Sequence, residues 1–232
     1  MELKKGIFYG VGVGPGDPEL LTVKALRVLG SCPVLACPQT KGEEMLALDI
    51  VRQAMDVSGK TILPLHFTMS RDPDVQHQAH LEAAEKVCEY LEVGQDVAMP
   101  NLGDVSIYST YCYLMELVKE RGFETRMVAG VPSFCAVAAK LGISLTEMNT
   151  PLHIAPGKAE LSEVMHWPGN KILMKSGRQM PEVLRAIEEH DGLDKSAMVQ
   201  NCGLPGEKVY PNLAKDAPKE TTGYFATVIV KE

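Results

Sequence analysis

The chain alternates short apolar runs with longer segments in which apolar residues recur every three or four positions. In the first half, four runs typical of buried strands are each followed by a segment with helical periodicity. We expect strands at 7–13, 33–37, 61–65 and 96–100, and helices at 18–29, 43–56, 75–92 and 107–121. This alternation predicts an α/β fold with a mostly parallel sheet covered by helices.

The second half is richer in strands, and its helices are shorter. We expect strands at 124–128, 151–155, 171–175, 197–201, 208–212 and 223–232, and helices at 132–141 and 181–190. The pattern predicts a second α/β domain with a mixed sheet. Because a helix stops at Gly122, we expect an N-terminal domain at 1–121 and a C-terminal domain at 122–232.

The first predicted strand runs into VGVGPGDPEL, residues 11–20, which looks like a nucleotide-binding turn. Its glycines fail the dinucleotide pattern G-x-G-x-x-G in every frame, and no lysine completes a phosphate-binding loop. Asp17 is expected to cap the following helix, with Pro18 at its first position. An acidic cap repels phosphate, so a ligand here is not expected to be held through phosphates.

Four further loops of glycine and small polar residues follow predicted strands. They lie at 101–110, 129–133, 175–178 and 200–206. Ligands of open α/β sheets bind beyond the carboxyl ends of the strands. Any one loop is compatible with a plain turn, but five in succession predict a ligand groove between two domains.

Composition and charge narrow the classes of function. The chain has 232 residues, 45% of them hydrophobic, and a formal net charge of −7. This charge disfavours nonspecific binding to nucleic acid or to an anionic membrane. No apolar run reaches the roughly 20 residues of a membrane span, and the N-terminus is typical of a first strand rather than of a signal peptide. We therefore expect a cytoplasmic protein.

Neither the cysteines nor the histidines form a known metal motif. The six cysteines include no C-x-x-C pair, so most are expected to fill small apolar spaces. His77 and His80 lie three residues apart on a predicted helix, with His66 upstream. A solvated helix face explains them better than metal binding, and we expect no metal site.

The glycine loops carry a resemblance to a known family. Residues 11–29, 102–110 and 122–145 and the two later glycine turns resemble the tetrapyrrole methylases, which transfer a methyl group from S-adenosylmethionine to a ring carbon. Residues 63–73, together with LGDVSIYSTYCYL, look most like the precorrin-2 or cobalt-factor II C-methyltransferases, which act at carbon 20 in cobalamin biosynthesis. The resemblance implies a two-domain enzyme whose active site lies in the cleft between the domains, and typically a homodimer.

The same resemblance implies the site residues. Around the cofactor we expect Pro15, Leu102, Gly103, Asp104, Ile107, Ser133, Phe134, Ser176 and Cys202. The first glycine loop is expected to wall the substrate side. Asp104 is the candidate base for the proton that the methylated carbon loses, although it is as well suited to hold the cofactor or a substrate nitrogen by hydrogen bonding. For the substrate carboxylates we expect Arg71, Lys175 and Arg178.

The chain departs from the family pattern at two places. The family commonly has G-D-P where this chain has Gly103, Asp104 and Val105, and P-G where it has Ala129 and Gly130. Neither change removes a hydrogen-bonding side chain, so the cofactor loop is expected to survive.

Several functions stay open on the sequence. Within the family, the alternatives are a uroporphyrinogen III methylase and a methylase of a modified protein histidine; the sequence does not distinguish a metal-free from a cobalt-bearing substrate. A dinucleotide-dependent reductase is disfavoured by the failed glycine fingerprint. A non-catalytic binding module for a small molecule is not excluded, because fold does not dictate activity.

Overall fold

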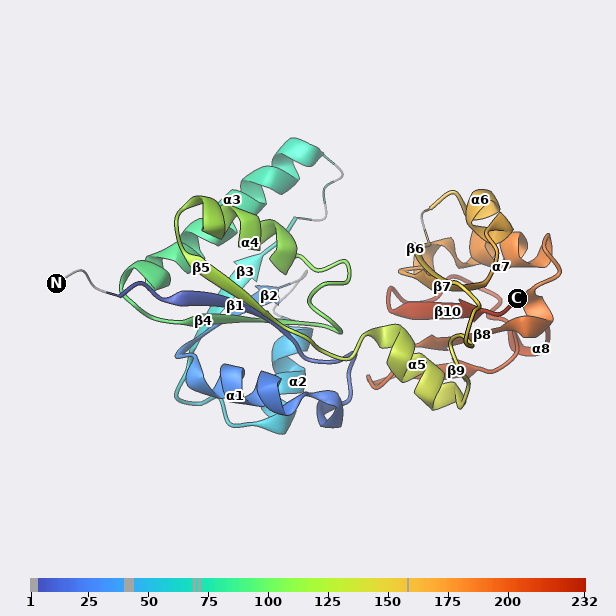
Figure 1. Cartoon of the computed structure of the whole chain (residues 1–232), viewed down its shortest axis with the longest axis horizontal. Coiled ribbons are helices and arrows are strands. Elements are labelled where there is room, and N and C mark those ends of the chain that lie inside the picture. Colours follow the sequence, from blue (N-terminus) through green and yellow to red (C-terminus); the bar gives the residue numbers. More distant parts are fainter. Residues whose placement is uncertain (1–3, 40–43, 69, 71, 158) are drawn as a thin grey trace. The chain divides into compact units, whose positions relative to one another are not determined.

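Two five-stranded sheets organise the chain (Figure 1). The computed structural model describes residues 4–39, 44–68, 70, 72–157 and 159–232. The sheets belong to two compact units, Met1–Pro132 and Ser133–Glu232. The α/β prediction, with a parallel sheet followed by a mixed one, is confirmed.

The sheet of the first unit is parallel throughout, with the strand order β3-β2-β4-β1-β5. Its strands are β1 (Ile7–Gly12), β2 (Val34–Gln39), β3 (Thr61–His66), β4 (Val97–Asn101) and β5 (Glu124–Val128). Its α-helices are α1 (Val23–Ser31), α2 (Leu46–Ala54), α3 (Pro73–Glu92) and α4 (Tyr111–Glu120). In Figure 1, α1 and α2 cover one face of this sheet, and α3 and α4 cover the other. The apolar runs are continuous because both faces are buried.

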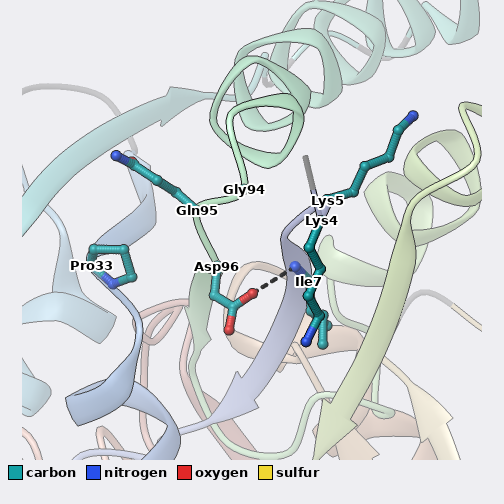
Figure 2. Close-up of a pocket in the computed structure, with 7 residues that line it drawn as sticks. All are labelled: Lys4, Lys5, Ile7, Pro33, Gly94, Gln95 and Asp96. Carbon is teal, nitrogen blue, oxygen red and sulfur yellow. Dashed lines mark hydrogen bonds between the residues drawn. The ribbon is translucent and has the colours of Figure 1, made fainter. Parts of the chain in front are cut away.

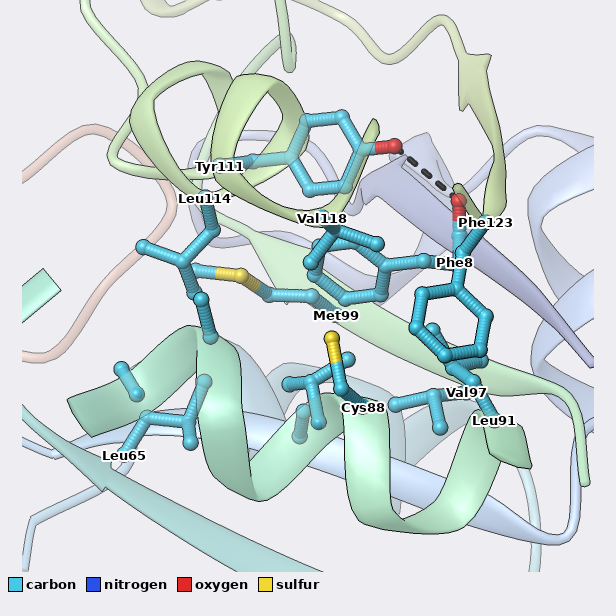
Figure 3. Close-up of a cluster of buried hydrophobic side chains, with 14 of the residues drawn as sticks. Phe8, Leu65, Cys88, Leu91, Val97, Met99, Tyr111, Leu114, Val118 and Phe123 are labelled. Atoms are coloured by element: carbon cyan, nitrogen blue, oxygen red, sulfur yellow. Dashed lines mark hydrogen bonds between the residues drawn. The ribbon is translucent and has the colours of Figure 1, made fainter. Parts of the chain in front are cut away.

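Tyr111 is a large, fully buried member of the core between this sheet and helices α3 and α4 (Figure 3). Its ring is fully buried and lies 4.9 Å from the ring of Phe8 on β1. Its hydroxyl donates to the carbonyl of Phe8 at 3.1 Å and to that of Arg126 on β5 at 2.9 Å. Burial raises the pKa of Tyr111, so the hydroxyl remains a donor. One side chain thus joins α4 to two neighbouring strands.

The second unit has a mixed sheet with the strand order β6-β7-β10-β8-β9. Its strands are β6 (Leu152–Pro156), β7 (Asn170–Met174), β8 (Ser196–Gln200), β9 (Lys208–Tyr210) and β10 (Ala226–Val230). Its α-helices are α5 (Ser133–Leu141), α6 (Leu161–His166), α7 (Met180–Glu188) and α8 (Leu213–Asp216). β6 and β7 are parallel, whereas β10 is antiparallel to both β7 and β8. Helices α6 and α8 are absent from the sequence prediction because each is too short for its periodicity to be recognised.

The boundary between the units differs from the one predicted at Gly122. β5 follows that glycine, yet it pairs with β1 from Ile7↔Glu124 to Val11↔Val128 and so completes the first sheet. The first compact unit accordingly extends to Pro132. A helix that ends at glycine marks a turn, but the pairing of the next strand decides to which sheet it belongs.

Asp17 caps a shorter element than predicted. Its carboxylate accepts from the amide of Glu19 at 2.9 Å and so begins the 3-10 turn η1 (Pro18–Leu20). The α-helix starts afterwards at Val23, where the Thr22 hydroxyl accepts from the amide of Ala25 at 3.0 Å. Thr22 is the better α-helical N-cap because its hydroxyl reaches the third helical amide.

The cysteines behave largely as apolar filler. Cys32, Cys37, Cys88 and Cys202 are buried, and Cys135 is exposed. Burial raises the pKa of both Cys32 and Cys37 to about 12, so these two remain protonated thiols near neutral pH. Within the described ranges, no helix combines the length and apolar character that crossing a membrane requires.

Candidate active site

Two glycine loops are bonded to each other at the carboxyl edge of the first sheet. β1 and β4 are parallel neighbours. Just beyond their ends, Gly14 and Gly103 form an isolated antiparallel bridge. The amide of Gly103 donates to the carbonyl of Gly14 at 2.7 Å, and the reverse bond measures 3.2 Å. The loop at 101–110 and the loop that contains Pro15 therefore form one rigid element.

The loop that follows β5 packs against these two loops at Gly130. A Cβ atom at Gly12 would lie 2.6 Å from the amide nitrogen of Gly130, and one at Gly130 would overlap the carbonyl oxygen of Gly103. These backbones approach more closely than any side chain permits. The loops that follow β1, β4 and β5 thus meet at the carboxyl edge of the first sheet.

Asp104 holds this junction together. One carboxylate oxygen accepts from the amide and the hydroxyl of Ser106, and the other accepts from the amide of Gly130 at 2.8 Å. Burial raises the pKa of Asp104, but the three hydrogen bonds outweigh it and leave the pKa below its ordinary value. The carboxylate is therefore charged at neutral pH and is a weak proton acceptor.

The loop at 101–110 is also fixed at its two ends. The buried Asn101 accepts a hydrogen bond from the Ser109 hydroxyl at 2.7 Å, and the Ser109 hydroxyl accepts in turn from the amide of Tyr111. Between these ends, the predicted cofactor residues Leu102 and Ile107 are half-buried, whereas Pro15 and Gly103 are buried. Sequence reasoning missed Asn101 and Ser109 as anchors because their pairing depends on how the loop folds back.

The predicted cofactor residues of the second unit also gather at one sheet edge. Ser133, at the start of α5, lies 3.3 Å from Thr227 of β10 between the hydroxyl oxygens. Thr227 is paired with Met174 on one side and Val199 on the other. The ends of β7 and β8 therefore lie beside it, and Ser176 and Cys202 follow these ends. Phe134 is buried in the first turn of α5.

Two buried hydroxyls at this second edge lack a partner among the described residues, namely those of Ser176 and Thr222. They lie close together in the chain fold, since the amide of Thr222 donates to the carbonyl of Gly177 at 2.9 Å. Buried polar atoms are nearly always hydrogen-bonded. Orphaned hydroxyls at this edge fit a polar ligand that would complete their bonding. Thr222 had no signal in the sequence, because the chain returns to this edge only through the pairing of β10.

Strained backbone accompanies these loops. Tyr108, Lys175 and Asn201 adopt positive φ angles of 51°, 56° and 52°. Each lies in a predicted ligand loop, and Lys175 and Asn201 directly follow β7 and β8. The left-handed region costs a non-glycine residue roughly 1–3 kcal/mol and is often found at functional sites.

The structure places two of the three predicted carboxylate-binding cations at the edge of the second sheet. Lys175 is half-buried, with its Nζ 6.0 Å from the centre of the Tyr224 ring, and Arg178 is exposed in the 3-10 turn η2 (Gly177–Gln179). Arg71 lies outside the described residues.

The histidines of the first unit do not converge on a point. His66 ends β3 and His77 is exposed on α3, whereas the ring of His80 is stacked on that of Tyr113. Across the parts of the chain that the structure describes, no three histidine, cysteine or acidic side chains are grouped as metal ligands.

A pocket of about 340 Å³ lies at the opposite edge of the first sheet (Figure 2). Its lining comes from the starts of β1, β2 and β4 and includes Lys4, Lys5, Pro33 and Asp96. Asp96 accepts from the amide of Ile7 at 2.8 Å and so ties β1 to β4. Ligands of parallel sheets collect at the carboxyl ends of the strands, so this pocket is not the candidate active site.

The chemistry of both edges is that of binding and alignment. The first offers glycine backbone and a carboxylate that is already hydrogen-bonded, and the second offers small hydroxyls beside cations. Groups of this kind suit a reaction in which the protein binds and aligns two reactants rather than attacking one of them itself.

The chain matches known proteins over most of its length. Residues 8–218 match the family described as Tetrapyrrole (Corrin/Porphyrin) Methylases. A probable cobalt-precorrin-2 C(20)-methyltransferase of Methanocaldococcus jannaschii is 37% identical over 83% of this chain and 84% of its own. A precorrin-2 C(20)-methyltransferase of Sinorhizobium sp is 30% identical over 97% of this chain and 95% of its own.

Solved structures share the fold at lower identity. A cobalt precorrin-4 methyltransferase has a TM-score of 0.76 at 20% identity and covers 97% of this chain and 94% of its own. A uroporphyrin-III C-methyltransferase of Thermus thermophilus, complexed with S-adenosylhomocysteine, has a TM-score of 0.69 at 20% identity and covers 98% of this chain and 92% of its own.

Proposed function

Because the chain belongs to the tetrapyrrole methylase family, we propose that it is an S-adenosylmethionine-dependent C-methyltransferase that methylates carbon 20 of precorrin-2 or cobalt-factor II in cobalamin biosynthesis. The observation that carries the proposal is the similarity along most of the chain to relatives named for this reaction. The absence of a phosphate-binding motif agrees with it, since an adenosyl sulfonium carries no phosphate.

The reaction is an in-line displacement. A bond forms between the electron-rich meso carbon and the methyl carbon, the bond from that carbon to sulfur breaks, and its electron pair stays on sulfur. The methylated carbon then loses its proton to water. Holding two reactants in this geometry supplies up to about 7–11 kcal/mol of the barrier. This role suits loops made rigid by the Gly14–Gly103 bridge and the Asp104–Gly130 bond.

We propose that the cofactor is bound through the residues that the resemblance named. In the first unit these are Pro15, Leu102, Gly103, Asp104 and Ile107, and in the second Ser133, Phe134, Ser176 and Cys202. The close glycine backbones and the orphaned Ser176 hydroxyl support the assignment. Lys175, Arg178 and Arg71 remain the proposed partners of the substrate carboxylates. A homodimer in the cytoplasm is proposed alongside, and light scattering on the purified protein tests the dimer.

The test of the proposed function is turnover of precorrin-2 and of cobalt-factor II with methyl-labelled S-adenosylmethionine. One added methyl group, assigned to carbon 20 by NMR, is the expected product, and the faster substrate identifies the natural one. Labelled product from uroporphyrinogen III alone would overturn the assignment within the family. Binding of S-adenosylhomocysteine without turnover of any of these tetrapyrroles would overturn the proposed reaction.

Asp104 is expected to act as a positioning residue rather than as the base. Asp104→Asn keeps an acceptor for the Gly130 amide and should retain turnover at saturating cofactor within about tenfold of wild type, whereas Asp104→Ala removes every acceptor and should lose more. The measurement is kcat for both variants between pH 6 and 9. Because the pKa of Asp104 is lowered, the stabilisation from its charged form is lost only as pH falls through that lowered value. A kcat for Asp104→Asn as low as that of Asp104→Ala would instead identify the carboxylate as the base.

A further inference from the structure

Three aromatic rings form a rim on the first unit, which we call the aromatic rim: Phe67, His80 and Tyr113. His80 lies on the core-facing stripe of α3, one turn before the buried Ala83 and Ala84. Its ring is parallel to that of Tyr113 within 7°, with the centres 5.0 Å apart, and the ring of Phe67 is 5.8 Å away on a tilt of 55°. The rim continues the hydrophobic core outward, and Phe67 packs against that core.

Tyr113 ends the stack at the surface. Tyr113 is 62% exposed, while its ring is stacked on that of the half-buried His80. Burial, with a smaller effect of His77, lowers the pKa of His80, so the stack is uncharged at neutral pH. The stack therefore presents an uncharged aromatic ring to the surface.

The aromatic rim includes residues at the same end of the first sheet as the candidate active site. Phe67 directly follows β3, and Tyr113 lies in the first turn of α4, which begins where the loop containing Asp104 ends. The thiol of Cys112 donates to the carbonyl of Val105 at 3.5 Å and ties this turn to the same loop. Phe67 and the first turn of α4 thus lie at the carboxyl end of the first sheet, where a ligand is expected to bind.

We propose that the aromatic rim is a substrate-positioning surface, on which a flat face of the tetrapyrrole lies against the ring of Tyr113. The inference rests on the proposed function and names the surface that orients the macrocycle. The His80 ring holds the Tyr113 ring in place. A flat ligand therefore stacks on Tyr113 with less loss of side-chain freedom than it would on a mobile tyrosine. The broad apolar face of a tetrapyrrole matches the uncharged stack, while its carboxylates need cations elsewhere.

The test compares Tyr113→Ala, Tyr113→Leu and Tyr113→Phe. Tyr113→Ala should raise KM for the tetrapyrrole about tenfold, Tyr113→Leu should raise it by an intermediate factor, and Tyr113→Phe should stay within about twofold. The dissociation constant of S-adenosylhomocysteine, measured by calorimetry, should be unchanged in all three. Absorbance titration with cobalt-factor II should show the same order without turnover. The matched control is Val93→Ala, which removes a side chain that is 61% exposed at the far end of α3 and should change nothing.

The possible failures are distinguishable. If the wild-type protein neither methylates nor binds the tetrapyrroles, the proposed function is wrong, and the proposed role of the aromatic rim is wrong as well. If wild type is active but Tyr113→Ala keeps the wild-type KM and titration curve, the inference alone fails. A weakened affinity for S-adenosylhomocysteine would assign the rim to the cofactor, and a changed oligomeric state on light scattering would assign it to contact with a second copy; either result overturns the proposal.

Discussion

Tyr111→Ala is expected to destabilise the first unit by about 3–5 kcal/mol, the cost typical of removing a fully buried aromatic ring. The ring fills the space between α4 and β1, and its centre lies 4.9 Å from the centre of the Phe8 ring. A Cβ atom at Gly10 would lie 2.5 Å from the Tyr111 ring, so the ring sits directly on the β1 backbone. Its loss leaves a cavity and two carbonyls, on β1 and β5, without their hydroxyl donor.

The measurement has to follow the first unit by itself. The one tryptophan, Trp167, lies in the second unit, so its fluorescence serves as the internal control for that unit. Hydrogen exchange of the β1 and β5 amides during urea titration should report the loss. Tyr111→Phe, which keeps the ring, should cost only about 1 kcal/mol. Equal effects of the two variants would show that the hydroxyl, and not the packed ring, supplies the stability.

Gly130→Ala is expected to lower kcat/KM by about a hundredfold, the loss typical of misplacing bound reactants by about 1 Å. The new methyl group would overlap the Gly103 carbonyl oxygen and lie 2.7 Å from the Gly12 backbone. Both neighbours are backbone atoms, so no side chain can turn away to make room. The loop after β5 must move, and the bond between the Gly130 amide and Asp104 is lost with it. Steady-state kinetics with saturating S-adenosylmethionine provides the measurement.

Gly30→Ala is the matched control for this substitution. Gly30 lies within α1, and a Cβ atom there would approach nothing closer than the Met55 methyl group at 4.0 Å. Alanine in a helix is favoured over glycine by roughly 0.5–1 kcal/mol, so this variant should unfold at a slightly higher temperature with unchanged kinetics. Wild-type kcat/KM in Gly130→Ala would mean that the junction of the three loops is not needed for the reaction.

The local sequence pattern was enough to locate most of the strands and the glycine loops that follow them. β5 coincides with its predicted run, and β1, β4, β7 and β8 end within one residue of theirs. β1, β4, β7 and β8 are short, largely apolar runs followed within a few residues by glycine, and both signals are local properties of the chain. The resemblance to the tetrapyrrole methylases was likewise visible in the loops, because their glycines are fixed by close backbone contacts.

The partners of the site residues could not be predicted in the same way. Asp104 was expected to face a ligand, yet its acceptors are engaged by Ser106 and by Gly130, 26 residues further along the chain. Thr222 and Thr227 reach the second edge only because β10 inserts between β7 and β8. Hydrogen bonds between distant segments depend on strand order, and periodicity carries no information about strand order.

The sequence by itself therefore determined the two-part α/β organisation, the positions of the glycine loops and the family. Only the tertiary structure decided that β5 belongs to the first sheet, that three glycine backbones meet beneath Asp104 and that His80 is stacked beneath an exposed Tyr113. The division has a physical cause. Burial and turn geometry depend on local sequence, whereas contacts between distant segments depend on which strands pair with each other in the sheet.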